Sequence, residues 1–304
     1  MKQLLAAVLM LLAVPLAGCG EAPSPAPAAQ ASAGGTTSTG SPAAESPNPV
    51  DRPPPLTLHL ASGDLDLEPW TYCWTTACVD GVPRDDLADV GGPNAIDFSF
   101  PKPGWEFSAT FSEHGEHRCK RRITVPAEPT GAGTWRVNPA GPAGAWDVDL
   151  FGNGPGGDVI TSFTWTTPTD GTLPGPASGS AGVLADQDGE LDSYGVEVAV
   201  ADLASRPRSA QATVTVASAD GRSVAFPTRR QPGCWSEGSL WFTAPDRLGR
   251  QATSLGPGPF TYTVELDLDG TTYTGVGEWP TDETEDIAPH VPLTWTPALP
   301  AYTG

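Results

Sequence analysis

The chain has 304 residues, of which 36 are acidic and 16 basic, so its formal net charge near neutral pH is −20. A surface with this charge repels nucleic-acid phosphates and anionic lipid, which argues against nucleic acid as a partner. Glycine (35 residues) and proline (34 residues) are abundant. Apolar residues mostly alternate with polar ones and no helical period is evident, so we predict an all-β chain with many turns.

The N-terminus has the layout of an export signal. Lys2 supplies a positive charge, and residues 4–16 form an apolar run that is too short to span a bilayer as a helix. The run ends in Leu-Ala-Gly-Cys, with the cysteine at position 19. This motif resembles the lipobox of bacterial lipoproteins, in which lipid is attached to the cysteine and the chain is cut just before it. The alternative is an ordinary secretory signal with a chance cysteine.

The lipobox resemblance implies a location. Residues 1–18 are then a lipoprotein signal peptide, and Cys19 is the lipid attachment site that anchors the chain at the extracytoplasmic face of the cell membrane. Residues 19–55 are rich in Pro, Ala, Ser and Thr and contain too few large apolar residues to fold. We therefore predict a disordered tether, which the prolines stiffen to a reach of at most ~110 Å at ~3.1 Å per residue.

The remaining residues, 56–304, suit two domains of ordinary size. Alternating apolar residues predict a strand at 56–60 and a hairpin formed by 96–100 and 105–111. Near the C-terminus, the pair Asp269-Gly270 predicts a type I′ turn between two further strands. In that hairpin we expect three facing pairs: Leu268 with Thr271, Leu266 with Tyr273, and Val264 with Gly275.

Weak internal similarity predicts a duplication. Pro129, Gly133, Val148 and Leu150 recur 116 positions later, and Ser162–Pro168 resembles Pro292–Pro297. We therefore expect two tandem immunoglobulin-like β-sandwich domains, at 56–168 and 183–304, joined by a linker at 169–182. The usual Cys, Trp, Cys spacing is absent, so another sandwich topology or a jelly roll stays open. The chain also resembles tandem-domain lipoproteins of high-GC Gram-positive bacteria, a resemblance that implies no particular activity.

Four cysteines besides Cys19 predict disulfides, because thiols of exported proteins are oxidised. Three lie in the first copy and one in the second, so complete pairing places one bond across the domain boundary. Of three connectivities we favour Cys73 with Cys78 and Cys119 with Cys234; the alternative leaves the latter two as buried thiols. Since Cys119 and Cys234 lie near equivalent repeat positions, we expect the copies to meet about an approximate two-fold axis.

Two groups of residues are candidates for metal binding. His114 and His117 are three residues apart and have acidic neighbours. Asp186 and Asp188 belong to an acidic segment at the start of the second copy, where calcium would suit a domain junction. Neither has a diagnostic ligand spacing, so we interpret them as a polar loop and an acidic turn and predict no metal and no cofactor.

No enzyme motif is present: the sequence has no Gly-x-Ser-x-Gly, no His-Glu-x-x-His, no phosphate-binding loop and no dinucleotide fingerprint. A Ser-His-Asp triad stays open, because it is recognised by geometry. Four tryptophans near cysteines have two interpretations, core packing or a sugar-binding platform: Trp70, Trp74, Trp235 and Trp241.

The predicted function is a membrane-anchored, non-catalytic surface interaction or structural module. Its partners are the membrane, through the lipid on Cys19, and an unknown envelope or extracellular protein or glycan. Two alternatives remain, a solute- or metal-binding lipoprotein and a cell-envelope hydrolase.

Overall fold

The computed structural model describes residues 52–304, except for 83–85, 116–118, 187–189, 194 and 285–289. Cys19, His117 and Asp188 lie outside the described residues, as do the signal peptide and most of the tether, so these predictions stay predictions. Within the part of the chain that the structure describes, no helix is both long and apolar enough to cross a membrane.

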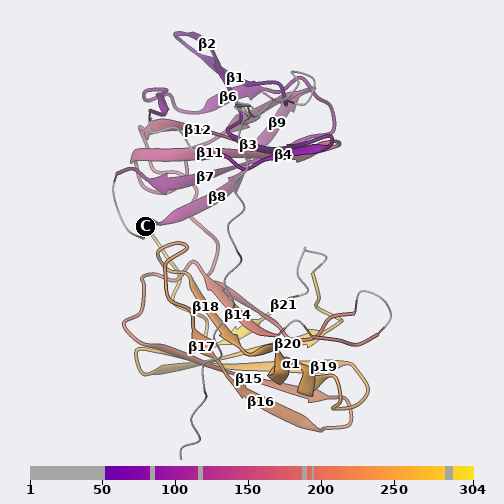
Figure 1. The fold of residues 1–304 in the computed structure, drawn as a ribbon. Helices are drawn as coiled ribbons and strands as arrows, with labels where there is room; N and C mark the ends of the chain where they lie inside the picture. The colour runs from indigo at the N-terminus through magenta and orange to yellow at the C-terminus, as the bar shows by residue number, and fades with distance from the viewer. Residues whose placement is uncertain (1–51, 83–85, 116–118, 187–189, 194, 285–289) are drawn as a thin grey trace, which may run out of the picture. The chain divides into compact units, whose positions relative to one another are not determined.

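The first sandwich consists of two sheets (Figure 1). One has the order β2-β1-β6-β10-β9, with β1 Leu56–Leu60, β2 Gly63–Leu67, β6 Ile96–Ser99, β9 Glu128–Gly131 and β10 Thr134–Val137. The other has the order β4-β3-β12-β11-β7-β8, with β3 Thr71–Trp74, β4 Ala77–Val79, β7 Glu106–Glu113, β8 Arg122–Pro126, β11 Gly144–Gly154 and β12 Gly157–Thr167. Strand β5 (Ala88–Asp89) pairs with β12 in parallel, and the other strand pairs are antiparallel.

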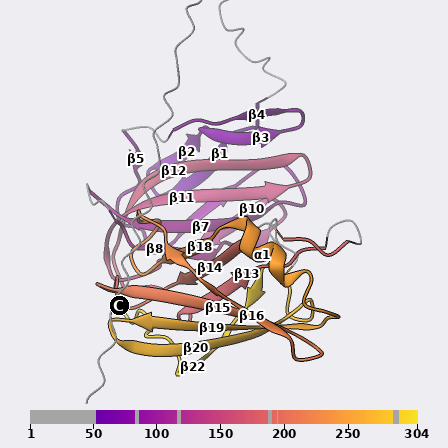
Figure 2. The ribbon, with the colours of Figure 1, turned by 60° about the horizontal axis from the view of Figure 1, so that its bottom comes forward.

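The second sandwich also has two antiparallel sheets, and Figure 2 shows β15, β19, β20 and β22 as neighbours. One sheet has the order β17-β18-β14-β13-β21, with β13 Ser178–Gly182, β14 Val196–Ala201, β17 Arg229–Arg230, β18 Leu240–Ala244 and β21 Val291–Pro292. The other has the order β16-β15-β19-β20-β22, with β15 Ala210–Ser218, β16 Ser223–Pro227, β19 Phe260–Leu268, β20 Thr271–Trp279 and β22 Thr294–Thr296. A short helix, α1 (Asp246–Ala252), follows β18.

Both sandwiches share one strand order, which is immunoglobulin-like. In the lettering of that fold, A-B-E-D corresponds to β1-β6-β10-β9 and to β13-β14-β18-β17. The facing sheet, C′-C-F-G, corresponds to β8-β7-β11-β12 and to β16-β15-β19-β20. This agreement resolves the topology that the sequence left open. It places the recurring pairs Val148 with Val264 and Leu150 with Leu266 on equivalent strands, β11 and β19. The predicted recurrence of Pro129 and Gly133 was wrong, because these residues precede the E strand, whereas their counterparts 116 positions later follow it.

Alternation of apolar residues places one side of each sheet in a core, and each sandwich has a core of its own. In β1, for example, Leu56 and Leu58 are buried, whereas His59 points outward. Aromatic residues fill the first core, where Phe98, Phe111 and Trp165 are almost fully buried. Separate cores mean that hydrophobic burial stabilises each sandwich individually.

The register of the C-terminal hairpin is as predicted. Leu268 faces Thr271, Leu266 faces Tyr273 and Val264 faces Gly275. Asp269 and Gly270 both have positive φ, 51° and 87°, as the two central residues of a type I′ turn require.

Three predictions about the arrangement of strands were wrong. The segments 96–100 and 105–111 do not form a hairpin, because β6 and β7 belong to opposite sheets. Residues 178–182 lay within the predicted linker but form β13. Ser162–Pro168 and Pro292–Pro297 are not equivalent, since β12 is a central strand and β22 lies at the edge, next to β20. In each case local pattern identified strand-forming residues but not their partners.

Candidate functional site

The disulfides join Cys73 to Cys78 and Cys119 to Cys234. This is the favoured pairing, and the alternative of two buried thiols was wrong. Cys73 and Cys78 face each other across β3 and β4. Cys119 lies between β7 and β8, the C–C′ connection, whereas Cys234 lies between β17 and β18, the D–E connection. These positions are not equivalent, so the predicted two-fold contact was wrong, and the bond joins unlike surfaces.

Arg121 lies beside this bond and is 3% exposed. Its guanidinium donates hydrogen bonds to the carbonyls of Leu203 and Ala204, each at 3.2 Å. The same group lies 3.8 Å from the ring centroid of Tyr302 and 4.0 Å from a carboxylate oxygen of Glu237. Carbonyl acceptors, an aromatic face and a carboxylate together compensate the desolvation of a buried positive charge.

Backbone hydrogen bonds reinforce the contact between the two connections. The Glu237 N–H donates to the Lys120 carbonyl at 2.9 Å, and the Arg122 N–H donates to Ser236 Oγ at 3.1 Å. Burial raises the pKa of nearby Asp202, and the positive charge of Arg121 partly opposes that rise. We call this cluster the junction. It consists of Cys119, Cys234, Arg121 and the residues named above that contact them.

The metal candidates gain no support from the described residues. Nδ1 of His114 lies 2.6 Å from Asp147 Oδ1, and the Lys120 ammonium lies 2.9 Å from the other oxygen of the same carboxylate. A neighbouring ammonium disfavours a metal cation there. Asp186 is exposed, and its predicted co-ligand Asp188 is not among the described residues. Over the described ranges, no three His, Cys, Asp or Glu side chains converge to hold a metal ion.

A Ser-His-Asp arrangement occurs on the outer face of the first sandwich. Nε2 of His59 lies 3.1 Å from Ser99 Oγ, and Nδ1 lies 2.9 Å from Asp64 Oδ1. These contacts follow from strand register, because β1 is paired with β2 on one side and with β6 on the other. The connectivity of the three side chains is that of a hydrolytic triad.

The surroundings of Ser99 differ from those of an acyl-transfer site, where backbone N–H groups point at the developing oxyanion. The N–H of Phe100, the next residue, donates to the Gly133 carbonyl at 3.1 Å. Ser99 itself is paired on both sides, with Thr57 and with Thr134. The adjoining groove of about 550 Å³ includes Ser99 in its lining, but neither His59 nor Asp64.

The row of residues beside this arrangement alternates between carboxylates and basic side chains. Asp64, His59, Asp97 and Arg136 face one another in turn across β2, β1, β6 and β10. Both oxygens of Asp97 accept hydrogen bonds from Arg136 at 2.8 Å, which lowers the pKa of this carboxyl. Such cross-strand pairs stabilise a sheet, and they account for His59 and Asp64 without catalysis.

The four tryptophans of the predicted platform divide into two pairs. Trp74 is buried in the first core, whereas Trp70 is half-buried outside that core, with its Nε1 donating to Ser162 Oγ at 2.9 Å. Trp235, in contrast, is 69% exposed. Its ring lies 5.4 Å from that of Trp241, centroid to centroid, at an interplanar angle of 50°. Of these four tryptophans, core packing therefore explains only Trp74.

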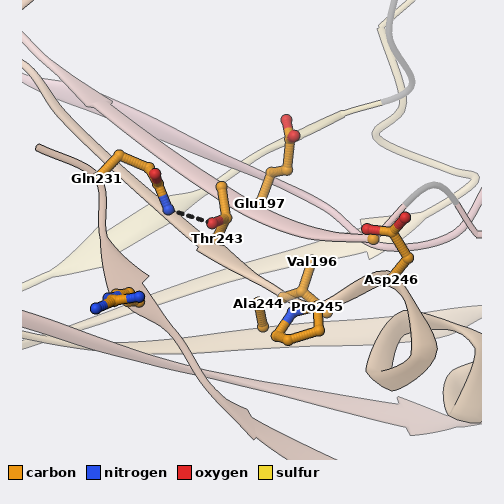
Figure 3. Close-up of a pocket in the computed structure, with 9 residues that line it drawn as sticks. Val196, Glu197, Gln231, Thr243, Ala244, Pro245 and Asp246 are labelled. Carbon is orange, nitrogen blue, oxygen red and sulfur yellow. Dashed lines mark hydrogen bonds between the residues drawn. The ribbon is translucent and has the colours of Figure 1, made fainter. Parts of the chain in front are cut away.

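Trp241 lies on the outer face of the second sandwich, next to polar residues of the same face. On β18, Leu240 and Phe242 point into the core, whereas Trp241 and Thr243 point outward. Strand register places Ala199 beside Trp241 and Glu197 beside Thr243. A groove of about 400 Å³ continues from this row (Figure 3), and it is lined by Gly195, Val196, Glu197, Arg229, Gln231, Thr243, Ala244, Pro245 and Asp246.

The groove carries both hydrogen-bond donors and acceptors. Figure 3 shows the Gln231 amide directed at Thr243, to whose hydroxyl it donates. The backbone N–H of Gln231 donates to the Trp241 carbonyl at 2.8 Å, which fixes the segment next to the tryptophan pair. Glu197, Arg229 and Asp246 are exposed. We call Trp235, Trp241 and this groove the Trp surface. Sequence reasoning singled out its tryptophans but missed the groove, whose residues come from three separate segments of the chain.

Comparisons with known proteins leave the family open. No protein-family model matches the chain, and no curated protein matches it. Among solved structures, the chain is similar to the FN1-FN3 domains of chicken CNTN1, with 12% identity over 72% of this chain and 86% of that chain and a TM-score of 0.18. The fold stated above rests on the strand order of the two sandwiches and not on this likeness.

Proposed function

We propose that this chain is a lipid-tethered, non-catalytic interaction module on the outer face of a bacterial cell membrane. The Leu-Ala-Gly-Cys motif ending at Cys19 supports the anchor, and the Pro-rich residues 19–55 support a tether. The cross-sandwich bond and the buried Arg121 support a joined pair of domains as the displayed unit.

One observation carries the binding role: Trp235 is 69% exposed and packs against Trp241 on an outward face. Leaving an indole in water costs free energy that burial in the second core would have recovered. Large exposed apolar side chains grouped together, with polar groups around them, are typical of interaction sites. The Trp surface has this composition.

The anchor is tested in a bacterial host that processes lipoproteins. We expect the full-length chain to enter the detergent phase of a Triton X-114 separation, with an acylated Cys19 as first residue by mass spectrometry. The Cys19→Ala variant is expected to carry no acyl group and to keep residues 1–18, whereas the control Ser24→Ala is expected to be cut and acylated like the parent. Unmodified protein beginning elsewhere, or cutting of Cys19→Ala before residue 19 as in the parent, contradicts the proposal.

A hydrolase is the second candidate function, favoured by the Ser99–His59–Asp64 contacts. Because the neighbouring backbone N–H group of Phe100 is already engaged, we expect no covalent labelling by a fluorophosphonate probe that reacts with activated serines. Labelling that disappears in Ser99→Ala, but persists in the β7 control Ser108→Ala, would replace the non-catalytic proposal. The metal-binding alternative is tested by metal analysis after dialysis, with one equivalent as the supporting result.

A further inference from the structure

We propose that the Trp surface binds a neutral carbohydrate chain. This inference rests on the proposed interaction function and specifies the chemical class of its partner. The tryptophan pair, the polar groups of the groove and the charge of the chain favour this ligand class.

The tryptophan pair presents an exposed indole ring, that of Trp235, to a ligand. The Trp235 ring lies 5.4 Å from the half-buried Trp241 ring at an interplanar angle of 50°, and it is itself 69% exposed, so Trp241 supports an indole that is open to solvent. A pyranose ring has an apolar face of C–H groups and a rim of hydroxyls. Its apolar face therefore packs on an indole while its hydroxyls remain free for hydrogen bonds. A flexible aliphatic partner would gain less from a flat ring.

The groove supplies hydrogen-bond donors and acceptors for the hydroxyl groups of a sugar. A hydroxyl both donates and accepts hydrogen bonds, so it is best met by mixed partners. Glu197 and Asp246 are acceptors, Arg229 is a donor, and the Gln231 amide provides both. Thr243 lies two residues along β18 from Trp241, a separation of roughly 7 Å in a strand. Neighbouring sugar units of one chain therefore reach the aromatic and the polar parts together.

Charge selects against anionic polymers. Two of the three exposed charged side chains that line the groove are carboxylates, Glu197 and Asp246, and the whole chain has a formal charge of −20. Phosphate-bearing or uronate-rich polymers are repelled by such a surface. A neutral saccharide pays no such electrostatic penalty, and so it fits better than a nucleic acid, a teichoic-type polyphosphate or an acidic polysaccharide.

The test titrates the full-length chain, held in a detergent without a sugar headgroup, with maltohexaose, cellohexaose and chitohexaose. Tryptophan fluorescence and calorimetry are followed up to ~5 mM saccharide, a range that detects millimolar dissociation constants. We expect saturable binding of at least one saccharide. Trp235→Ala and Trp241→Ala are each expected to weaken that binding about tenfold, with Trp235→Phe between them and the parent.

Control variants separate loss of the site from loss of the fold. Phe151 on β11 is also an exposed aromatic residue, 39% exposed, but it lies on the first sandwich, so Phe151→Ala is expected to bind like the parent. Glu197→Gln keeps the shape of the groove and is expected to change affinity by less than the tryptophan variants. Each variant must retain the parent's far-ultraviolet circular dichroism.

Three results overturn the inference: no saturation with any of the three saccharides, binding that is unchanged in Trp235→Ala, or binding of polygalacturonate in preference to the neutral chains. The inference is also overturned if a protein binds the Trp surface and none of the three saccharides competes with it. None of these results affects the acylation of Cys19, so failure of the carbohydrate site and failure of the membrane anchor are distinguishable.

Discussion

At the residue scale, Arg121 is a buried positive charge whose partners are mostly backbone atoms. Arg121→Ala removes this donor from the buried carbonyl of Leu203 and from the part-buried carbonyl of Ala204. Each unsatisfied buried acceptor is costly, so we expect the free energy of unfolding to fall by about 3 kcal/mol. Guanidinium denaturation at neutral pH measures this change.

Arg122 provides the matched control for that experiment. It adjoins Arg121 in sequence, but its side chain is 47% exposed and lies 3.8 Å from Asp149. Exposed ion pairs contribute little because water and salt screen them, so Arg122→Ala is expected to cost less than about 1 kcal/mol. Equal losses in the two variants would mean that burial of Arg121 is not what makes it important.

Asp202 gives a prediction about pH. Burial raises the pKa of its carboxyl, so folding favours the protonated form, and ionisation above the folded pKa costs stability. Asp202→Asn removes that cost and tolerates the left-handed backbone, whose φ is 60°. We expect a gain of less than about 1 kcal/mol at pH 7, because the group is only half-buried and solvent screens it.

The gain from Asp202→Asn should vanish under acidic conditions. Below about pH 3 the native carboxyl is itself protonated, so the variant and the parent are expected to unfold at the same denaturant concentration. Destabilisation of the variant at pH 7 would show instead that attraction to Arg121 outweighs the cost of burial.

At the scale of elements, the hairpin of β19 and β20 depends on its turn. Gly270 has φ of 87° and open space around it, so an added Cβ meets no atom and the penalty for Gly270→Ala is purely conformational. We expect a loss of about 1 kcal/mol in the free energy of unfolding. Gly175 also has open space but no positive φ, so Gly175→Ala is expected to be neutral or slightly stabilising. Thermal unfolding of the two variants compares them, and an equal cost would refute the turn argument.

The same elements show what could be predicted from sequence. Alternation located β1, β6, β7, β19 and β20, because burial of one face requires it. It failed for β13, whose residues are Ser-Gly-Ser-Ala-Gly with Ala181 as the buried residue. Small residues suit this strand because a Cβ at Gly179 would lie 2.8 Å from the Trp295 side chain. Partners of strands, such as those of β6 and β7, are fixed by long-range packing that no local pattern contains.

Only part of the candidate site was predictable, because strand pairing is not visible in local sequence pattern. Sequence identified Trp235 and Trp241 as aromatic residues near a cysteine, but their exposure depends on which face of β18 each residue occupies. The contacts of His59 with Ser99 and Asp64 depend on register between three strands. Both features arise from tertiary pairing, which becomes visible only in the folded chain.

At the scale of the whole molecule, the cross-sandwich disulfide couples two domains that have separate cores. Cys119 and Cys234 are 115 residues apart, whereas Cys73 and Cys78 are five apart. If disulfides act by restricting the unfolded chain, the long loop contributes about 5 kcal/mol and the short one about 2 kcal/mol. The double variant Cys119→Ser, Cys234→Ser is therefore expected to lose more stability than the control Cys73→Ser, Cys78→Ser.

The shape of the unfolding transition distinguishes coupling from stability alone. In the parent, opening of one sandwich is restrained by its covalent bond to the other, so we expect a single calorimetric transition. Without the Cys119–Cys234 bond, the contacts of Arg121, the packing of Tyr302 against the first core and a few hydrogen bonds still join the sandwiches, and each core is expected to melt at its own temperature, giving two transitions. A single transition in this double variant, shifted no further than in the Cys73 and Cys78 control, would show that noncovalent contacts at the junction suffice to couple the domains.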